Sequence, residues 1–201
     1  MVNEVIRHYD LLVDEGNDPV LDPPELAAYM DGWDGKAFID ALALDGTQDV
    51  LEIGVGTGRL AVRTALACRS FTGVDLSEKS IARAGEHLAG MPQVRLVCAD
   101  FMLWQTAQRF DVVYSSLTFM HLQDKPATAE KVARLLKPGG RAVISLDRDL
   151  SGVIDHGTRR LKVYPDDPAE MAAHLRQAGL RVLPALETEF AVILIAVKGG
   201  F

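Results

Sequence analysis

Short apolar runs alternate with helix-forming stretches between residues 49 and 146, and this alternation constrains the fold of the 201-residue chain more than any other feature. The apolar runs predict buried strands at residues 50–53, 71–74, 94–98, 110–115 and 141–146. The stretches between them predict helices at residues 59–68, 77–88 and 126–137, the second of them capped by Ser77. Strands that alternate with helices in this way form a parallel sheet with helices on both faces.

The segments before and after this region carry other patterns. Residues 1–46 hold helix-forming stretches near 5–12, 24–30 and 36–44, broken by Gly16 and by prolines, which predicts a helical lid. Near the other end, Asp167, Pro168 and Glu170 predict the start of a helix. The strands expected at 180–186 and 190–197 are joined by a turn too short for a parallel crossover, so we expect an antiparallel hairpin.

Composition argues against several classes of protein. Hydrophobic residues make up 48% of the chain and charged residues 24%, as in ordinary globular proteins. No apolar run approaches the roughly 18 residues of a membrane helix, and the first residues lack the apolar stretch of a secretory signal. The formal net charge of −7 disfavours a nucleic-acid partner. Cys68 and Cys98 are too few for a disulfide framework and are expected at buried positions, so we predict a cytoplasmic protein without membrane partners.

A glycine-rich turn, GVGTG at residues 54–58, follows the first predicted strand. Glycines let a ligand approach the backbone closely, and the N-terminus of the next helix offers free N–H groups. The spacing G-x-G-x-G differs from the dinucleotide pattern G-x-G-x-x-G, and the Lys-Ser/Thr pair of a phosphate-binding loop is missing. Taken alone, the turn is equally explained by a tight bend that requires glycine.

Acidic residues end the next two predicted strands. A carboxylate at the position of Asp75 can accept both hydroxyls of a ribose. A carboxylate at the position of Asp100 can accept from an adenine amino group, and the neighbouring Phe101 can cover the ring. Each aspartate alone is explained by a helix cap or a turn. Because ligands of open α/β sheets bind beyond the carboxyl ends of the strands, the three features together predict a nucleoside site.

Five stretches of the chain resemble the class I S-adenosylmethionine-dependent methyltransferases, in the order typical of that family: VLEIGVGTGRLA (50–61), TGVDLS (72–77), CADF (98–101), FDVVYSSLTFMHL (110–122) and LLKPGGRAVIS (135–145). The resemblance is to the small-molecule branch often called type 11. It implies a Rossmann-like three-layer α/β sandwich with a mostly parallel seven-stranded sheet, a C-terminal antiparallel hairpin and S-adenosylmethionine as cofactor. The cofactor-binding residues that it implies are Glu52, Gly54, Gly56 and Gly58 at the methionine part, Asp75 at the ribose, Leu76, Asp100 and Phe101 at the adenine, and Ser115 and Ser116 near the methyl group.

Methyl transfer from a sulfonium is an in-line displacement, so alignment and exclusion of water are the main tasks of the protein. A base is needed only when the acceptor arrives protonated, and His121 is the expected base, although a half-buried structural histidine explains the same position. Tyr9 and Trp33 of the lid are expected to line the pocket, where aromatic rings attract a sulfonium, and Tyr9 is a second catalytic candidate. The alternative is that these aromatic residues only pack the lid onto the sheet.

Two groups of charged residues remain outside this scheme. Asp147 and Asp149 follow the fifth predicted strand and are interpreted as solvated loop residues, so no metal site is predicted. Arg159 and Arg160 lie in the insert at residues 147–166, and two adjacent arginines can hold a carboxylate or a phosphate. We interpret this pair as solvated as well.

We therefore predict one domain, residues 1–201, with a lid at 1–46 and a cofactor-binding core at 47–201. Its predicted function is in-line methyl transfer from S-adenosylmethionine to a small-molecule acceptor. One alternative is a module that binds S-adenosylmethionine or S-adenosylhomocysteine without catalysis. A nicotinamide-dependent oxidoreductase is disfavoured by the glycine spacing, and aminopropyl transfer by the absence of carboxylates at Ser115 and Ser116.

Overall fold

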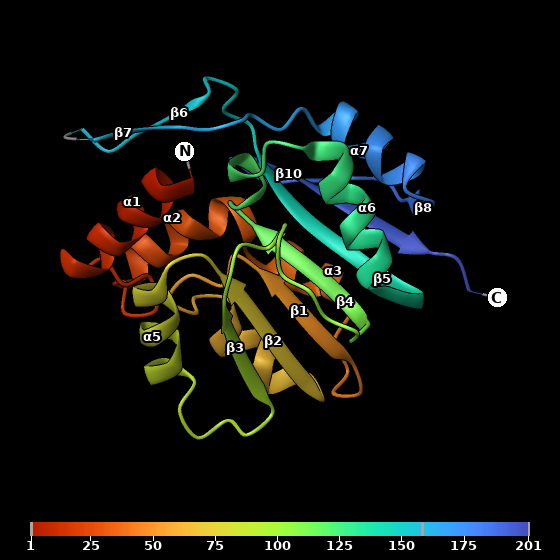
Figure 1. Cartoon of the computed structure of the whole chain (residues 1–201), viewed down its shortest axis with the longest axis horizontal. Helices are drawn as coiled ribbons and strands as arrows, with labels where there is room; N and C mark the ends of the chain where they lie inside the picture. Colours follow the sequence, from red (N-terminus) through yellow and green to blue (C-terminus); the bar gives the residue numbers. More distant parts are fainter. Residues whose placement is uncertain (1, 158, 201) are drawn as a thin grey trace.

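A computed structural model describes residues 2–157 and 159–200, and its centre is a twisted sheet (Figure 1). The strands are β1 (Asp49–Ile53), β2 (Ser70–Asp75), β3 (Val94–Cys98), β4 (Phe110–Ser116), β5 (Leu136–Asp147), β8 (Leu180–Val182), β9 (Leu186–Glu187) and β10 (Ala191–Lys198). Their order is β3-β2-β1-β4-β5-β10-β8, and β9 pairs with β10 beside this path. The pairs among β1 to β5 are parallel, whereas β10 is antiparallel to β5, β8 and β9. The predicted α/β class, parallel core and C-terminal antiparallel strands are confirmed. The sheet has eight strands instead of the expected seven, because the segment predicted as one strand at 180–186 forms both β8 and β9.

Helices cover both faces of this sheet. They are α1 (Val2–Asp14), α2 (Pro24–Asp34), α3 (Lys36–Leu42), α4 (Ala61–Thr64), α5 (Glu78–His87), α6 (Lys125–Leu135) and α7 (Pro168–Gln177), with short 3₁₀ turns η1 (Ala65–Ala67) and η2 (Phe119–His121). Successive residues of β1 point to opposite faces: Val50 packs in the cluster of α3, α4 and α5, and Leu51 in the cluster of α6 and α7. Both side chains are fully buried, which stabilises the fold by about 1.5–3 kcal/mol for each.

The predicted helix caps are confirmed. The Ser77 hydroxyl accepts a hydrogen bond from the Ser80 N–H at 3.0 Å, and the Asp167 carboxylate accepts from the N–H groups of Ala169 and Glu170. These contacts satisfy N–H groups that have no partner within a helix.

Tertiary pairing changes three predicted boundaries. The helix expected at 59–68 shortens to α4 and η1, because the glycine turn continues to Leu60. β5 begins at Leu136 rather than at 141, since Leu136 pairs with Phe110 before a register shift. The strand expected at 180–186 divides into β8 and β9 around Pro184, which has no N–H to donate.

Cys98 is exposed rather than buried, because β3 is an edge strand of the sheet.

The N-terminal 46 residues divide between two places. Helix α1 lies beside α5, where the Ser77 hydroxyl donates to Asp10 at 2.6 Å, whereas α3 enters the core through the fully buried Phe38. Beyond β5, strands β6 (Val153–Asp155) and β7 (Arg160–Lys162) form a hairpin that reaches over α1 (Figure 1). Within residues 2–157 and 159–200, no helix has the length and apolarity needed to cross a bilayer.

Candidate active site

The carboxyl ends of the parallel strands surround a cavity of about 210 Å³. Its lining includes Val5, Ile6 and Tyr9 of α1, Gly54 and Gly56 of the glycine turn, Asp75, Leu76 and Ser77 after β2, Ala99 and Phe101 after β3, and Ser116, Leu117, Thr118 and His121 after β4. Helix α1 forms the roof of this cavity. This is the edge at which open α/β sheets bind ligands.

Bare main chain forms the floor. Gly54 has a φ of +78°, and a Cβ there would lie 1.9 Å from the Thr118 Oγ1, so only glycine fits. A Cβ at Gly56, with a φ of +54°, would meet no atom within 4 Å, which leaves this backbone open to a ligand. Gly58 does not line the cavity, and a Cβ at this position would point toward Ala84 of α5.

Asp75 borders this floor. One carboxylate oxygen accepts from the Gly56 N–H and the other from the Ser77 N–H, each at 2.9 Å. Burial raises the pKa of Asp75, and the backbone hydrogen bonds oppose that rise. A carboxylate has about four acceptor positions, so this one retains capacity for the hydroxyls of a ligand.

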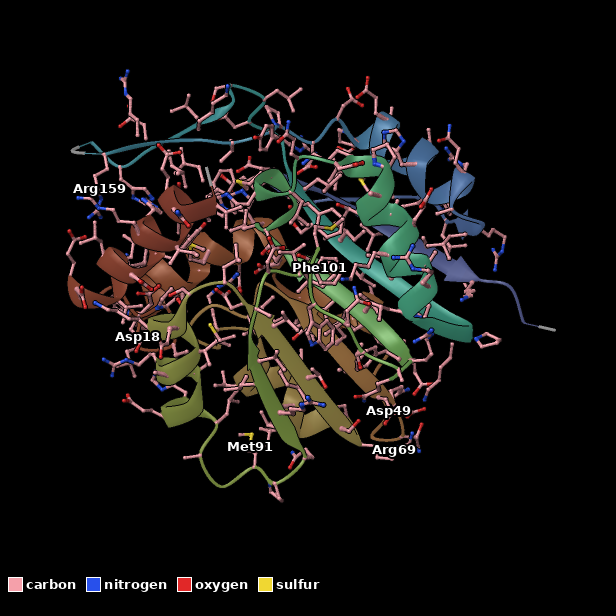
Figure 2. The ribbon with its side chains drawn as sticks, in the orientation of Figure 1. Asp18, Asp49, Arg69, Met91, Phe101 and Arg159 are labelled. Carbon is pink, nitrogen blue, oxygen red and sulfur yellow. The ribbon has the colours of Figure 1, made fainter. Side chains whose placement is uncertain are left out.

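The end of β3 supplies an aromatic wall. Phe101 is 4% exposed and lines the cavity (labelled near the centre of Figure 2), while Asp100 does not line it. The Asp100 carboxylate accepts a hydrogen bond from the Met102 N–H at 2.7 Å. This contact stabilises a turn, which the sequence analysis gave as the alternative to adenine binding for this residue. The Lys131 ammonium lies 4.9 Å from the centre of the Phe101 ring and donates to the carbonyls of Met102 and Trp104, which fixes this loop.

Tyr9 and His121 join the roof to the end of β4. The Tyr9 hydroxyl lies 2.8 Å from the His121 Nε2. Burial raises the pKa of Tyr9 and lowers the pKa of His121 to about 4, the latter with help from the charges of His8 and Lys125. Both groups are therefore neutral at pH 7, and the tautomer of His121 decides which of the two atoms donates in this hydrogen bond. The His121 Nδ1 is buried and has no hydrogen-bond partner among the described residues.

A buried polar network lies behind the cavity wall. The Ser116 hydroxyl donates to the Asp34 carboxylate, which also accepts from the Arg59 guanidinium, and Asp34 is fully buried. Because its proton is directed at Asp34, the Ser116 hydroxyl can act toward the cavity only as an acceptor. Asp34 and Arg59 belong to elements far apart in the sequence, and no local pattern marks their pairing.

Glu52 and Ser115 lie one layer deeper and do not line the cavity. Glu52 accepts from the Tyr114 hydroxyl at 2.8 Å, and burial raises its pKa to about 8, so this side chain is protonated at neutral pH. Ser115 donates to the Ile53 carbonyl at 2.9 Å. Both hydrogen bonds join β1 to β4 next to the cavity.

Trp33 lies away from the cavity. Its ring packs against Phe190 at 4.5 Å and Tyr29 at 5.3 Å, measured between ring centres. Gly32 permits this packing, because a Cβ there would lie 2.4 Å from the Phe190 ring. Of the two lid aromatics expected to line the pocket, the structure therefore brings Tyr9 to the cavity and leaves Trp33 against the turn between β9 and β10.

Comparison with known proteins gives the family. Residues 50–140 match the family described as "Methyltransferase domain". A ubiquinone biosynthesis O-methyltransferase of Aromatoleum aromaticum is 31% identical over 165 residues, which cover 74% of this chain and 70% of that protein. The chain belongs to the S-adenosylmethionine-dependent methyltransferases. The cofactor and the α/β fold expected from the sequence are those of this family.

Other relatives of this methyltransferase match over smaller parts or share only the fold. Phosphoethanolamine N-methyltransferase 3 of Arabidopsis thaliana is 37% identical over 116 residues, but these cover 55% of this chain and 23% of the longer relative. A structure described as the DhpI–SAH complex aligns over 99% of the chain with a TM-score of 0.76 and 21% identity. The [4+2]-cyclase SpnF aligns with a TM-score of 0.79 and 17% identity over 100% of the chain, so the fold alone does not determine the reaction.

Proposed function

We propose that this methyltransferase binds S-adenosylmethionine in the cavity roofed by α1 and transfers its methyl group to a small-molecule acceptor. The observation that carries the proposal is the Asp75 carboxylate, which retains acceptor capacity beside the open main chain of Gly56. The other walls suit the same cofactor. Leu76, Ala99 and Phe101 offer apolar contact to a base, and Ser116 offers an acceptor to an ammonium group.

When bound, the cofactor supplies an electrophilic methyl group on a sulfonium. Asp75 would hold the ribose hydroxyls, Phe101 the base, and Ser116 the amino group of the methionine part. Tyr9 would exclude water from the reacting atoms, and its ring would attract the sulfonium. The chain thus contributes mainly orientation and a dry site.

An acceptor with an O–H or N–H group loses a proton when it is methylated. His121 is the group placed to receive that proton at Nε2, after the Tyr9 hydroxyl has moved aside. Its lowered pKa keeps the imidazole unprotonated at neutral pH, which is the form that can accept a proton. In this scheme Tyr9 positions and shields Nε2, and His121 is the catalytic residue.

The size of the cavity supports a mobile roof. Ligand pockets have volumes of about 300–1,000 Å³, and the 210 Å³ here is smaller. We therefore infer that α1 moves outward to admit the cofactor and closes again over it, which breaks and reforms the bond between Tyr9 and His121. In this proposal α1 is the lid, and α3 belongs to the cofactor-binding core.

The acceptor is proposed from the names of the relatives. A ubiquinone biosynthesis O-methyltransferase and a phosphoethanolamine N-methyltransferase both point to small molecules as the acceptor class. The roofed cavity agrees with this class, because a polymer would need an open surface beside the methyl group.

Calorimetry with S-adenosylmethionine and S-adenosylhomocysteine tests the binding step. We expect one equivalent to bind, and NADH not to compete; binding of NADH instead would overturn the proposal. Methyl-labelled cofactor with a metabolite extract then tests transfer. Cofactor binding without transfer to any metabolite would favour the non-catalytic module.

The roles of Tyr9 and His121 are tested with the acceptor identified by that screen. We expect His121→Asn to lower kcat by about 100-fold or more and to leave the affinity for S-adenosylhomocysteine within a few fold. Tyr9→Phe should have a smaller effect on kcat, because the base remains. Normal turnover in His121→Asn would remove this residue from the mechanism.

A further inference from the structure

A second hollow, here called the outer groove, lies on the other side of α1. It measures about 400 Å³ between α1 and the end of the β6–β7 hairpin, near the Arg159 label in Figure 2. Glu4, Arg7, His8 and Leu11 of the helix line it, together with residues 159–162. These helix positions face away from Val5, Ile6 and Tyr9, as the 3.6-residue period requires. One helix is thus the roof of the cavity and the wall of the outer groove.

The lining of the outer groove carries more cationic than anionic side chains, in a chain whose formal net charge is −7. Its lining holds four cationic side chains, Arg7, Arg159, Arg160 and Lys162, and one carboxylate, Glu4. Two of the cations are neutralised nearby: Glu15 accepts two hydrogen bonds of 2.6 Å from Arg159, and Asp155 accepts one from Arg160. Arg7 and Lys162 form no hydrogen bond or ion pair with any residue in the described part of the chain. Arg7 of α1 and Lys162 of β7 therefore place one unpaired cation on each side of the groove.

The wall of the groove also holds polar atoms without partners. His8 is 5% exposed, and its Nε2 is buried with no hydrogen-bond partner among the described residues. The Nε of Arg159 is also buried and has no hydrogen-bond partner among these residues. The His8 ring lies 4.9 Å from the ring of His156, between ring centres. Buried polar groups without partners are costly and call for a ligand, a water or an ion.

We propose that the outer groove binds a phosphate-type dianion. Two unpaired cations on facing elements match the charge of one dianion, and the guanidinium and ammonium groups supply donors to its oxygens. The oxygens would lie between Arg7 of α1 and Lys162 of β7. A small rotation of the His8 ring would add a third donor.

The bound anion would hold the roof closed. It would contact α1 and β7 together, so it would bind the closed arrangement more tightly than the open one. The same chemistry is offered by free inorganic phosphate and by the phosphoryl group of a metabolite. Neither source depends on the proposed methyl transfer.

Titration of the full chain with inorganic phosphate at constant ionic strength, without cofactor, tests the outer groove. Calorimetry should show one site, and phosphate should raise Tm where sodium chloride does not. We expect Arg7→Gln combined with Lys162→Gln to weaken the binding by about tenfold or more. Both side chains are exposed, so the variant should keep its Tm in the absence of phosphate.

Arg95→Gln combined with Arg134→Gln is the matched control, because both arginines are exposed and lie outside the groove. It removes the same charge and should leave the affinity for phosphate unchanged. An equal loss in both double variants, or no binding by the natural chain at millimolar phosphate, would overturn the proposal. Glycerol phosphate distinguishes the sources: tighter binding than inorganic phosphate supports a phosphorylated metabolite, and equal binding supports the free anion.

Discussion

The two ends of the sheet use aspartate in opposite ways. At the amino end, Asp49 accepts hydrogen bonds from the side chains of Arg69, Ser70 and Lys137, and Lys137 also pairs with Asp111. Figure 2 shows Asp49 and Arg69 together at this end, far from α1. At the carboxyl end, Asp75 accepts only from backbone N–H groups and faces a cavity. Carboxylates paired by side chains serve stability, and those with spare capacity are available to a ligand.

The same contrast exists within one strand. Asp49 begins β1 and Glu52 lies three residues later. The Arg69 guanidinium, and after it Lys137 and Ser70, lower the pKa of Asp49, whereas burial raises the pKa of Glu52 to about 8. Position relative to solvent and to cations, not residue type, decides which form of the carboxyl group the fold stabilises.

The largest effect is expected from Asp75→Ala at the carboxyl end. The affinity for S-adenosylhomocysteine should fall by roughly 1–3 kcal/mol, since hydrogen bonds to the ribose are lost in a buried site. Calorimetry measures this loss of affinity. Asp111→Ala, at the amino end, is the control and should bind normally. If the two variants bind equally well, the functional difference between the ends disappears.

Glu52→Gln should stabilise the fold at high pH. The folded pKa of Glu52 is raised above its ordinary value of 4.5, so its stabilising neutral form is fully present below 4.5 and is lost as the pH rises through about 8. The glutamine is neutral throughout and keeps an acceptor for Tyr114. Urea unfolding at pH 8 should show a gain in the free energy of unfolding, and this gain should shrink toward pH 5. The exposed Glu130→Gln serves as the control, and an equal gain there would contradict the assignment to Glu52.

Asp49→Asn should act in the opposite pH range. The folded pKa of Asp49 is depressed below its ordinary value of 3.8, so its contribution is present above 3.8 and is lost as the pH falls further. Because the Arg69 side chain is 60% exposed, solvent screens the pair, and we expect a loss of only about 1 kcal/mol at pH 7. The affinity for S-adenosylhomocysteine should not change. Acid unfolding curves of the variant and the natural chain should approach each other as the pH falls below 3.8.

The smallest effect concerns backbone strain at the carboxyl end. Leu117 lines the cavity with a φ of +54°, a conformation that costs a residue with a side chain about 1–2 kcal/mol. Leu117→Gly should therefore be about 1 kcal/mol more stable than Leu117→Ala, because only glycine relieves the strain. Chemical unfolding of the two variants gives the difference directly. Equal stabilities would mean that the neighbouring residues relax to absorb the strain.

Local sequence patterns predicted the parts of the fold that local physics controls. The caps at Ser77 and Asp167 needed only the neighbouring N–H groups, and both are confirmed. The break at Pro184 had a local signal, because proline has no N–H to donate to a neighbouring strand. The beginning of β5 depended on pairing with Phe110, which the period of the sequence does not encode. Strand register and the exact ends of strands therefore could not be predicted from the sequence alone.

The candidate site was predictable to a similar degree. The glycine turn and Asp75 carry a pattern, and the structure brings them together with Tyr9 and His121 at one cavity. The structure places Asp100 in a turn, which was the local alternative considered for it. Trp33 packs against Phe190, a distant partner that spacing alone does not reveal. The pairing of Asp34 with Arg59 joins residues 25 positions apart and had no signal in the sequence.

Helix α1 and the residue that follows it dock onto segments that lie far along the chain. Tyr9 meets a histidine 112 positions later, and Glu15 meets Arg159 after 144 positions. Such long-range contacts form only after the intervening chain has folded. The segment that closes the site should thus assemble at the end of folding, detach at the lowest cost, and exchange its amide hydrogens ahead of the central strands.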